Sequence, residues 1–216
     1  MRIRLVMGPG GSGKGTFAAR LAKEHDFYHI STGNIFRDAI NSKTDLGLKV
    51  KETIDSGGVV DNETVNQLIS HEIFKASKQD KIVLIDGYPR NMQQSMHLEN
   101  LLYHKKTEVE LAIIIDQPLM VLIDRVTNRR VCNSCGKLYN LKIDKEIEDG
   151  RCPSCGGYLY QRDEDQRDRY MKKYIEYVEN TAPVIENFMD RDKILYIHNP
   201  EKTDISDWEN WKPEDY

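Results

Sequence analysis

The 216-residue sequence predicts an α/β fold built on a parallel five-stranded sheet. Two observations support this class. Short runs rich in isoleucine, valine and leucine recur along the chain, and they are nearly continuous, as expected of parallel strands buried on both faces. Between these runs lie longer segments with the periodicity of amphipathic helices, and an alternation of strands and helices indicates a parallel sheet.

The expected elements follow one another along the chain. The strand-like runs are residues 5–7, a short stretch beginning near Tyr28, and residues 81–86, 111–116 and 193–198. The helical patterns cover residues 14–25, 62–76, 91–103 and 170–189, and Pro183 should bend or break the last of them. The segment from about 128 to 165 interrupts the alternation, so we expect an insertion with a small fold of its own.

Composition limits the classes of protein that fit. Hydrophobic residues make up 39% of the chain and charged residues 31%, with a net charge of −4. No apolar run approaches the ~20 residues needed to cross a bilayer. The first residues show no signal or transit peptide pattern, and cytoplasm is the expected compartment. The acidic balance argues against a general nucleic-acid binder.

A glycine-rich segment, GPGGSGKGT at residues 8–16, joins the first strand to the first helix. Glycines let consecutive backbone N–H groups surround phosphate oxygens, and the helix N-terminus adds its positive dipole end. Lys14 would place a charge on the β- and γ-phosphates, although Gly15 separates it from Thr16 where the usual pattern has Ser or Thr next. The alternative is a glycine-rich turn before an ordinary helix. Strand, spacing, lysine and helix together predict a nucleoside triphosphate site in a P-loop, three-layer fold.

Further motifs indicate the phosphoryl acceptor. They are STGNIFR at 31–37, DGYPRNMQQ at 86–94, DRVTNRR at 124–130 and QRDED at 161–165. A transferring phosphoryl group needs planar, permanently charged arginines that converge from separate segments. Arginines stand in or beside each motif: Arg37, Arg90, Arg125, Arg129 and Arg162. With the glycine loop, this set resembles adenylate kinases of the nucleoside monophosphate kinase family, from residue 1 to about 200. The insertion resembles the long zinc-carrying lid of many bacterial members.

The resemblance implies a reaction and its cofactors. MgATP would pass its γ-phosphoryl group to AMP and give two ADP, by positioning and electrostatics without a covalent enzyme intermediate. Asp86, at the end of a strand, would organise Mg²⁺ through water; the alternative is a carboxylate that caps the next turn. The implied catalytic set is Lys14, Asp86, Arg90, Arg125, Arg129, Arg162 and Lys173.

The resemblance also implies which residues contact each nucleotide. Thr32 would touch the adenine of AMP, Gln94 would read the base, and Arg37 and Arg90 would hold the phosphate. The AMP set further includes Gly58, Val59, Val60, Gly87, Tyr88, Pro89, Arg162 and Lys173. The ATP set is Gly11, Ser12, Gly13, Lys14, Gly15, Thr16, Arg125, Arg129, Leu138, Tyr139 and Lys202, in which Leu138 and Tyr139 would cover the adenine.

The chain departs from the family pattern at several positions. The proline of the glycine loop has moved one place, to Pro9, and Asn34 stands where an aspartate is usual. Glu164 replaces the first residue of a usual Asp-Asp pair. Lys173 replaces the second lid arginine and keeps the charge without the bidentate fork, so restoring arginine there is expected to raise kcat or leave it unchanged. In the C-terminal segment 204–216 the two tryptophans either pack on the core or belong to an acidic tail.

The four cysteines form two pairs, Cys132 with Cys135 and Cys152 with Cys155, each with two residues between its members. This spacing is typical of a zinc ribbon, and glycines follow both pairs. Four thiolates close a tetrahedral site, which indicates a structural rather than a catalytic zinc. The alternatives are an iron–sulfur centre and two disulfides.

The predicted domains are a core of residues 1–31, 61–127 and 166–216, a helical monophosphate-binding insert at 32–60, and a zinc-binding lid at 128–165. We expect a monomer whose partners are ATP, AMP and ADP, without nucleic acid or membrane. Three alternative functions stay open: a kinase for UMP or CMP, a nucleotide sensor with weak turnover, and an ATP-driven nucleic-acid protein whose zinc ribbon binds DNA or RNA. The acidic charge and the DGYPR segment argue against the last.

Overall fold

The structure, a computed structural model, describes residues 1–55, 60–147, 149–206, 208 and 211. Its internal contacts divide the chain into two compact units. The first unit comprises Met1–Gly8, Gly13–Ile115 and Glu179–Tyr216, and the second comprises Pro9–Ser12 and Asp116–Val178. The α/β class and the parallel five-stranded sheet predicted from the sequence are confirmed in the first unit.

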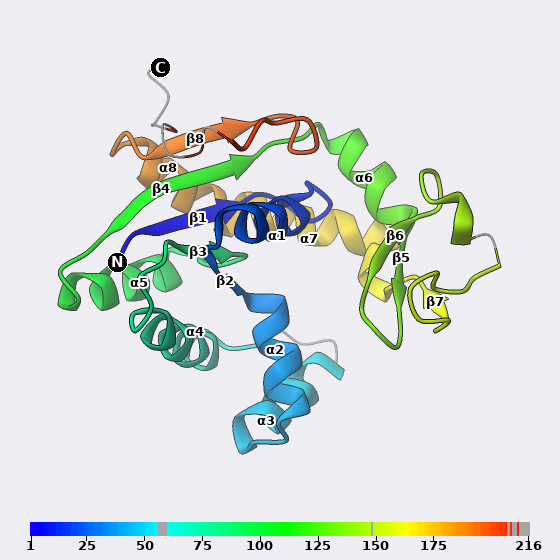
Figure 1. The fold of residues 1–216 in the computed structure, drawn as a ribbon, viewed down its shortest axis with the longest axis horizontal. Coiled ribbons are helices and arrows are strands. Elements are labelled where there is room, and N and C mark those ends of the chain that lie inside the picture. Colours follow the sequence, from blue (N-terminus) through cyan, green and yellow to red (C-terminus); the bar gives the residue numbers. More distant parts are fainter. Residues whose placement is uncertain (56–59, 148, 207, 209–210, 212–216) are drawn as a thin grey trace. The chain divides into compact units, whose positions relative to one another are not determined.

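The sheet of the first unit brings three of the sequence motifs to one edge. Its strands are β1 (Ile3–Met7), β2 (Tyr28–Ser31), β3 (Val83–Asp86), β4 (Val109–Ile115) and β8 (Ile194–Ile197), in the order β2-β3-β1-β4-β8 (Figure 1). All neighbours run parallel. In the register, Asp86 lies beside Val6 on one side and Ser31 on the other. The glycine loop, the motif that begins at Ser31 and the motif that begins at Asp86 therefore leave the sheet at the same edge.

Most predicted helices of the first unit are confirmed. Its helices are α1 (Lys14–His25), α2 (Thr32–Asn41), α3 (Asp45–Asp55), α4 (Asn62–Ala76), α5 (Met92–His104) and α8 (Ala182–Met189). The pattern at 170–189 is two helices, α7 (Arg167–Asn180) and α8, and Pro183 stands in the first turn of α8, where its missing N–H costs nothing. Helices α2 and α3 lie in the segment 32–60, which was expected to be helical without bounds for its helices, and α6 in the second unit was not predicted.

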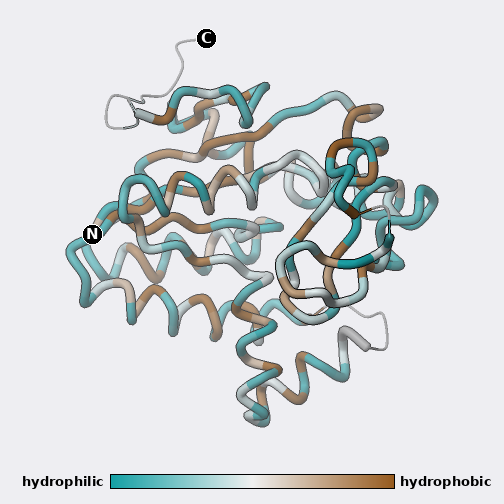
Figure 2. The backbone as a smooth tube through the Cα atoms, turned by 45° about the vertical axis from the view of Figure 1, so that its right-hand side comes forward, coloured by the Kyte–Doolittle hydropathy of each residue, from teal (hydrophilic) through white to brown (hydrophobic). Residues whose placement is uncertain are grey.

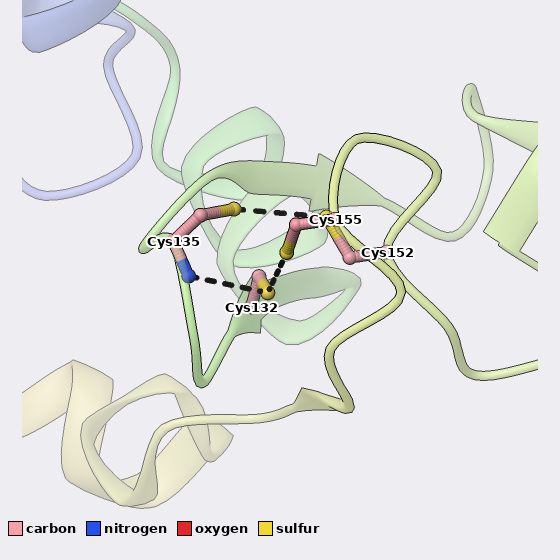
Figure 3. A group of neighbouring side chains, drawn as sticks. All are labelled: Cys132, Cys135, Cys152 and Cys155. Atoms are coloured by element: carbon pink, nitrogen blue, oxygen red, sulfur yellow. Dashed lines mark hydrogen bonds between the residues drawn. The ribbon is translucent and has the colours of Figure 1, made fainter.

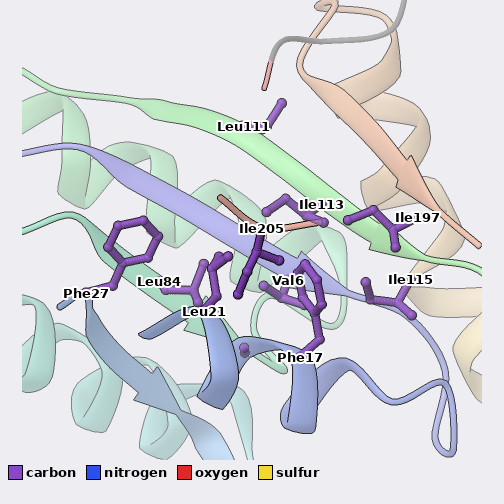
Figure 4. Close-up of a cluster of buried hydrophobic side chains, with 11 residues drawn as sticks. Val6, Phe17, Leu21, Phe27, Leu84, Leu111, Ile113, Ile115, Ile197 and Ile205 are labelled. Atoms are coloured by element: carbon purple, nitrogen blue, oxygen red, sulfur yellow. The ribbon is translucent and has the colours of Figure 1, made fainter. Parts of the chain in front are cut away.

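The core of the first unit forms where α1 covers the sheet. Phe17 and Leu21 of α1 pack against Val6, Leu84 and Ile113 of three neighbouring strands (Figure 4). Hydrophobic residues concentrate along these strands, as the hydropathy colouring in Figure 2 shows. Burying each such side chain contributes about 1.5–3 kcal/mol. This burial fixes α1, and with it the helix N-terminus that follows the glycine loop.

The two C-terminal tryptophans pack on this core. The Trp211 ring stacks on Phe17 with ring centroids 6.1 Å apart, and Trp208 meets Phe27 edge-on at 4.6 Å. The buried Arg4 side chain donates from Nη1 to the Trp208 carbonyl at 2.9 Å. Of the two alternatives for these residues, packing on the core is confirmed.

The second unit carries the cysteines on a small antiparallel sheet. Strands β5 (Arg129–Cys132), β6 (Leu138–Asn140) and β7 (Leu159–Tyr160) pair in the order β6-β5-β7, followed by a short 3₁₀ turn, η2 (Asp163–Asp165). Helices α6 (Leu119–Thr127) and α7 pack through Leu122, Val126 and Tyr170. The insertion with its own small fold is therefore present. Among the described residues, no helix is long and apolar enough to span a bilayer.

Candidate nucleotide site and cysteine cluster

The glycine loop has the backbone geometry that a phosphate site needs. Gly8, Gly11 and Gly13 adopt positive φ angles of 144°, 83° and 93°, a region that side chains other than glycine avoid. Gly13 is the N-cap of α1, and Lys14 is its first residue. The N-terminal N–H groups of α1 lack acceptors within the helix, so they and the helix dipole favour an anion at this end.

Two side chains of the second unit hold the middle of the loop. The Tyr170 hydroxyl donates to the Gly10 carbonyl at 2.7 Å, and Arg125 Nη1 donates to the Ser12 carbonyl at 3.2 Å. Burial raises the pKa of Tyr170 to about 12, so the hydroxyl stays a donor at neutral pH. The Gly10 and Ser12 carbonyls thus have side-chain donors, which hold this part of the loop backbone in place.

Asp86 lies at the end of β3, close to the beginning of α1. A Cβ atom added to Gly15 would come 3.4 Å from Asp86 Oδ2, so the carboxylate lies next to the first turn of that helix. Asp86 is buried, and its Oδ1 has no hydrogen-bond partner among the described residues. An unsatisfied buried carboxylate oxygen is costly unless a ligand or water completes it. This arrangement fits a carboxylate that binds Mg²⁺ through water.

Thr32 and Gly87, two residues expected to contact AMP, are in close contact with each other. Thr32 is buried at the start of α2, and its hydroxyl lies 3.4 Å from the carbonyl oxygens of both Asp86 and Gly87. Gly87 has φ 80°, and a Cβ atom there would lie 2.7 Å from Thr32 Oγ1. The sequence suggests no such contact, because 54 residues separate Thr32 from Asp86.

Arg90 is fixed through its backbone and through its guanidinium. Gln94 Oε1 accepts from the Arg90 backbone N–H at 2.8 Å, and the Thr181 hydroxyl donates to the Arg90 carbonyl at 2.8 Å. Arg90 Nε donates to the Gly87 carbonyl at 2.9 Å. Gln94 is buried, and its Nε2 donates to Asn62 Oδ1 at 2.8 Å. In this conformation, therefore, the Gln94 amide holds the Arg90 backbone.

The other residues expected around AMP take different positions. Arg37 is exposed and donates to Asn34 Oδ1, the oxygen of a neutral amide. Tyr88 is fully buried, and its hydroxyl donates to Asn66 Oδ1 at 2.7 Å. Pro89 and Val60 are also buried. Gly58 and Val59 lie outside the described residues.

The second unit gathers three cations around two adjacent carboxylates. Asp165 is buried and accepts two hydrogen bonds from Arg129, from Nε at 2.8 Å and from Nη2. Glu164 accepts from Lys173 Nζ at 2.9 Å, and its other oxygen lies 3.7 Å from Arg162 Nη1. Arg129, Arg162 and Lys173, predicted as one group from the sequence, thus lie together on carboxylates of η2.

The four cysteine sulfurs face one another (Figure 3). All four Sγ atoms lie within 4.8 Å of one another, with Cys132 to Cys155 at 3.4 Å and Cys135 to Cys152 at 3.7 Å. The distances rule out disulfides, since an S–S bond is about 2.05 Å long. A tetrahedral zinc with Zn–S bonds of about 2.3 Å has sulfur–sulfur edges of about 3.8 Å. The geometry of the four thiols fits a zinc ion.

Their ionisation also fits a metal. Burial opposes ionisation of Cys152, but the Tyr139 hydroxyl and two backbone N–H groups outweigh it and lower its pKa to about 6. At Cys155 a backbone hydrogen bond from Gly157 lowers the pKa, but Cys132 and Cys135 outweigh it, and its pKa is raised to about 12. Four thiolates therefore need a central cation. Gly157 closes the cluster, because a Cβ there would lie 2.8 Å from Cys132 Sγ.

Three residues predicted near ATP differ from one another in their surroundings. The Tyr139 ring is buried, and its hydroxyl lies 3.1 Å from Cys152 Sγ, so this side chain belongs to the cysteine cluster. Leu138 is 47% exposed and remains the side chain able to cover a base. Lys202 is exposed, and its backbone N–H donates to the Asn199 carbonyl at 3.1 Å.

Sequence reasoning missed the residues that position the functional side chains. Asp165 stands in the quoted QRDED segment, and its burial against Arg129 follows from the fold alone. Asn62 and Thr181 hold Gln94 and Arg90 from distant parts of the chain. Tyr170 begins a recognised helical pattern, but nothing in that pattern marks its hydroxyl as a partner of the glycine loop.

Comparison with known proteins identifies the family of this chain. The family model described as Adenylate kinase matches residues 6–193. Among similar proteins are adenylate kinases of Petrotoga mobilis, 40% identical over 91% of this chain and 89% of the relative, and of Thermosipho africanus, 36% identical over 90% of both. The adenylate kinase of a Thermoanaerobacter species is 38% identical over 91% of this chain and 90% of its own. The chain belongs to the adenylate kinase family.

Proposed function

We propose that this chain catalyses the reversible, Mg²⁺-dependent transfer of the γ-phosphoryl group of ATP to AMP, giving two ADP. Lys14 and the N–H groups of the glycine loop would bind the β- and γ-phosphates, and Arg90 and Arg37 would bind the phosphate of AMP. Arg125, Arg129, Arg162 and Lys173 would neutralise the charge of the transferring group. The proposal requires the cations of both units to reach that group during turnover, because positioning and electrostatics supply nearly all catalysis of this kind.

One observation carries the proposal: an ordered glycine loop at the N-terminus of α1 with an unsatisfied buried carboxylate beside it. The loop has three glycines at positive φ, and Asp86 lies next to the first turn of the helix with Oδ1 unpartnered among the described residues. A magnesium–triphosphate complex supplies what both features lack. The loop N–H groups gain anionic acceptors, and Asp86 gains the water shell of a divalent cation.

The two proposed metal ions have different roles, one at the phosphates and one in the cysteine cluster. Mg²⁺ supplies charge neutralisation on the phosphates when it is bound, and Asp86 is the residue of this chain proposed to hold its water. Zn²⁺ bound by Cys132, Cys135, Cys152 and Cys155 would be structural, because four thiolates leave no open position for substrate. Four reduced thiols also fit a reducing compartment such as cytoplasm. We further propose that residues 32–60 bind the monophosphate, that residues 128–165 form a lid, and that the chain works as a monomer.

The acceptor is tested by measuring ADP formation from MgATP with AMP, GMP, UMP and CMP under identical conditions. AMP should give the highest kcat/KM, because Thr32 and Gln94 stand at the positions that match adenine readers in the family. Equal or faster turnover with UMP or CMP would assign the chain to another monophosphate. Binding of ATP and AMP without measurable ADP would instead favour the nucleotide sensor.

Loss of the metal should disorder the cysteine-bearing sheet before the rest of the chain. The purified protein should contain about one zinc ion per chain, and Cys132→Ser or Cys155→Ser should release it and lower kcat. Limited proteolysis should then cut first within residues 128–165, because that segment has a small core of its own.

Exchange of zinc for cadmium separates a structural from a catalytic metal. Cadmium keeps tetrahedral thiolate coordination but differs as a Lewis acid, so kcat should stay within about threefold of the zinc form. Abolished turnover in a cadmium protein with an intact proteolysis pattern would make the metal catalytic.

A further inference from the structure

Glu164 lies between two of the cations proposed to act on the transferring phosphoryl group. Its two carboxylate oxygens face different partners: Oε2 accepts from Lys173 Nζ at 2.9 Å, and Oε1 lies 3.7 Å from Arg162 Nη1. The next residue, Asp165, pairs with Arg129. Of the three carboxylates of η2, Glu164 and Asp165 therefore divide these three cations between them, and Glu164 faces two of them.

Glu164 is a fixed negative charge in this position. Burial raises its pKa, but the hydrogen bond from Lys173 and the positive charges of Lys173 and Arg162 outweigh burial, and the net pKa is lowered. The side chains of Glu164 and Lys173 are 42% and 55% exposed, so a phosphate can approach them from solvent. A substrate phosphate would compete with this carboxylate for the same two cations.

The type of cation at position 173 decides the outcome of that competition. A lysine ammonium is a point charge with three donors, and the contact with Glu164 uses one of them. A guanidinium would grip a carboxylate with two parallel hydrogen bonds. An arginine at 173 would therefore engage both oxygens of Glu164, draw Oε1 away from Arg162, and be held more firmly away from a phosphate.

We propose that Glu164 is a positioning residue that functions with a lysine, and not an arginine, at position 173. It orients Lys173 and Arg162 toward the phosphoryl group. Its contact with Lys173 is weak enough to break when Lys173 binds that group. The inference rests on the proposed phosphoryl transfer. It reverses the expectation, drawn from sequence, that arginine at 173 would raise kcat or leave it unchanged.

The test is a mutant cycle of Glu164→Gln, Lys173→Arg and the double variant, with kcat and KM measured for ATP and AMP. Glu164→Gln should lower kcat about fivefold, which corresponds to ~1 kcal/mol, the upper range for a partly exposed ion pair. KM should stay unchanged or fall, because a charge that repels phosphate has been removed. Lys173→Arg should lower kcat at least about threefold. The double variant should be no slower than Lys173→Arg, since an arginine at 173 has already drawn Glu164 away from Arg162.

Asp163→Asn is the matched control. Asp163 lies next to Glu164 on η2 and pairs with Arg169 at 2.8 Å, and both side chains are exposed, at 79% and 56%. Removing this pair should leave kcat and both KM values unchanged. Melting temperature and zinc content, measured for every variant, identify any loss that comes from misfolding.

Either of two single-variant results would overturn the inference: Lys173→Arg as fast as the wild type or faster, or Glu164→Gln indistinguishable from Asp163→Asn. Losses that multiply in the double variant would also overturn it. If the wild type forms no ADP from ATP and AMP, the proposed function fails instead, so the two failures are distinguishable.

Discussion

Replacing Arg90 with alanine should lower kcat/KM for AMP by about a hundredfold or more. Arg90 is exposed, while its backbone is held by Gln94 and Thr181 and its Nε by Gly87, so its guanidinium is presented in one orientation. A charge-assisted contact made to the transferring group is worth roughly 3 kcal/mol in the transition state, and 1.36 kcal/mol corresponds to a factor of ten. Steady-state kinetics with AMP varied at saturating MgATP measure the loss.

Arg191→Ala is the control for Arg90→Ala. Arg191 is also in the first unit, and its Nη1 pairs with Glu99 at 2.9 Å on α5. Its removal should leave kcat/KM within about twofold. Arg90→Lys should recover part of the loss, because lysine restores the charge without the planar fork. A loss below fivefold in Arg90→Ala would mean that this side chain does not contact the reacting phosphate.

Gly11→Ala should damage the glycine loop far more than Gly10→Ala. The added Cβ would lie 2.6 Å from Val126 Cγ1 and 3.2 Å from the Leu122 carbonyl oxygen, and φ is 83°. The loop would have to move, at a further cost of about 1–2 kcal/mol for the left-handed backbone. Because a displacement of about 1 Å can cost a hundredfold in rate, kcat/KM for ATP should fall by about that factor.

Gly10→Ala is the matched control for Gly11→Ala. A Cβ at Gly10 would lie 3.4 Å from the Tyr170 ring, which is close to ordinary contact. This variant should keep kcat/KM within about fivefold. Adding Val126→Ala to Gly11→Ala removes the Cγ1 atom that clashes and should restore part of the activity. Equal activities for the Gly10 and Gly11 variants would show that the loop does not need this backbone.

The sheet could be predicted because its signal is local. The buried strands are nearly continuous apolar runs, and α1 and α4 begin and end where their patterns do. Helix α6 was missed because LMVLIDRVT is only nine residues long, and a short apolar segment does not distinguish a helix from a strand. Helix α2 lies in the segment expected to be a helical insert, but TGNIFRDAIN begins with residues of low helix propensity, so its bounds could not be given.

Only the parts of the site that lie within short sequence motifs could be predicted. The glycine loop and the cysteine spacing each lie within a short stretch of chain, and both have the predicted arrangement. The contacts that orient the side chains join residues far apart in the sequence: Thr181 lies 91 residues from Arg90, and Asp165 lies 36 residues from Arg129. Pairings of this kind depend on the tertiary fold, so the sequence indicated the cations but not their carboxylate partners.

The stereochemistry of transfer tests the central claim most directly. The claim is a single in-line displacement between ATP and AMP with no phosphorylated enzyme. ATP made chiral at the γ-phosphorus with three oxygen isotopes is incubated with AMP, and the configuration at the β-phosphorus of the ADP formed from AMP is determined. One in-line step predicts inversion. Retention would require two displacements through a covalent intermediate, and that result would contradict the account.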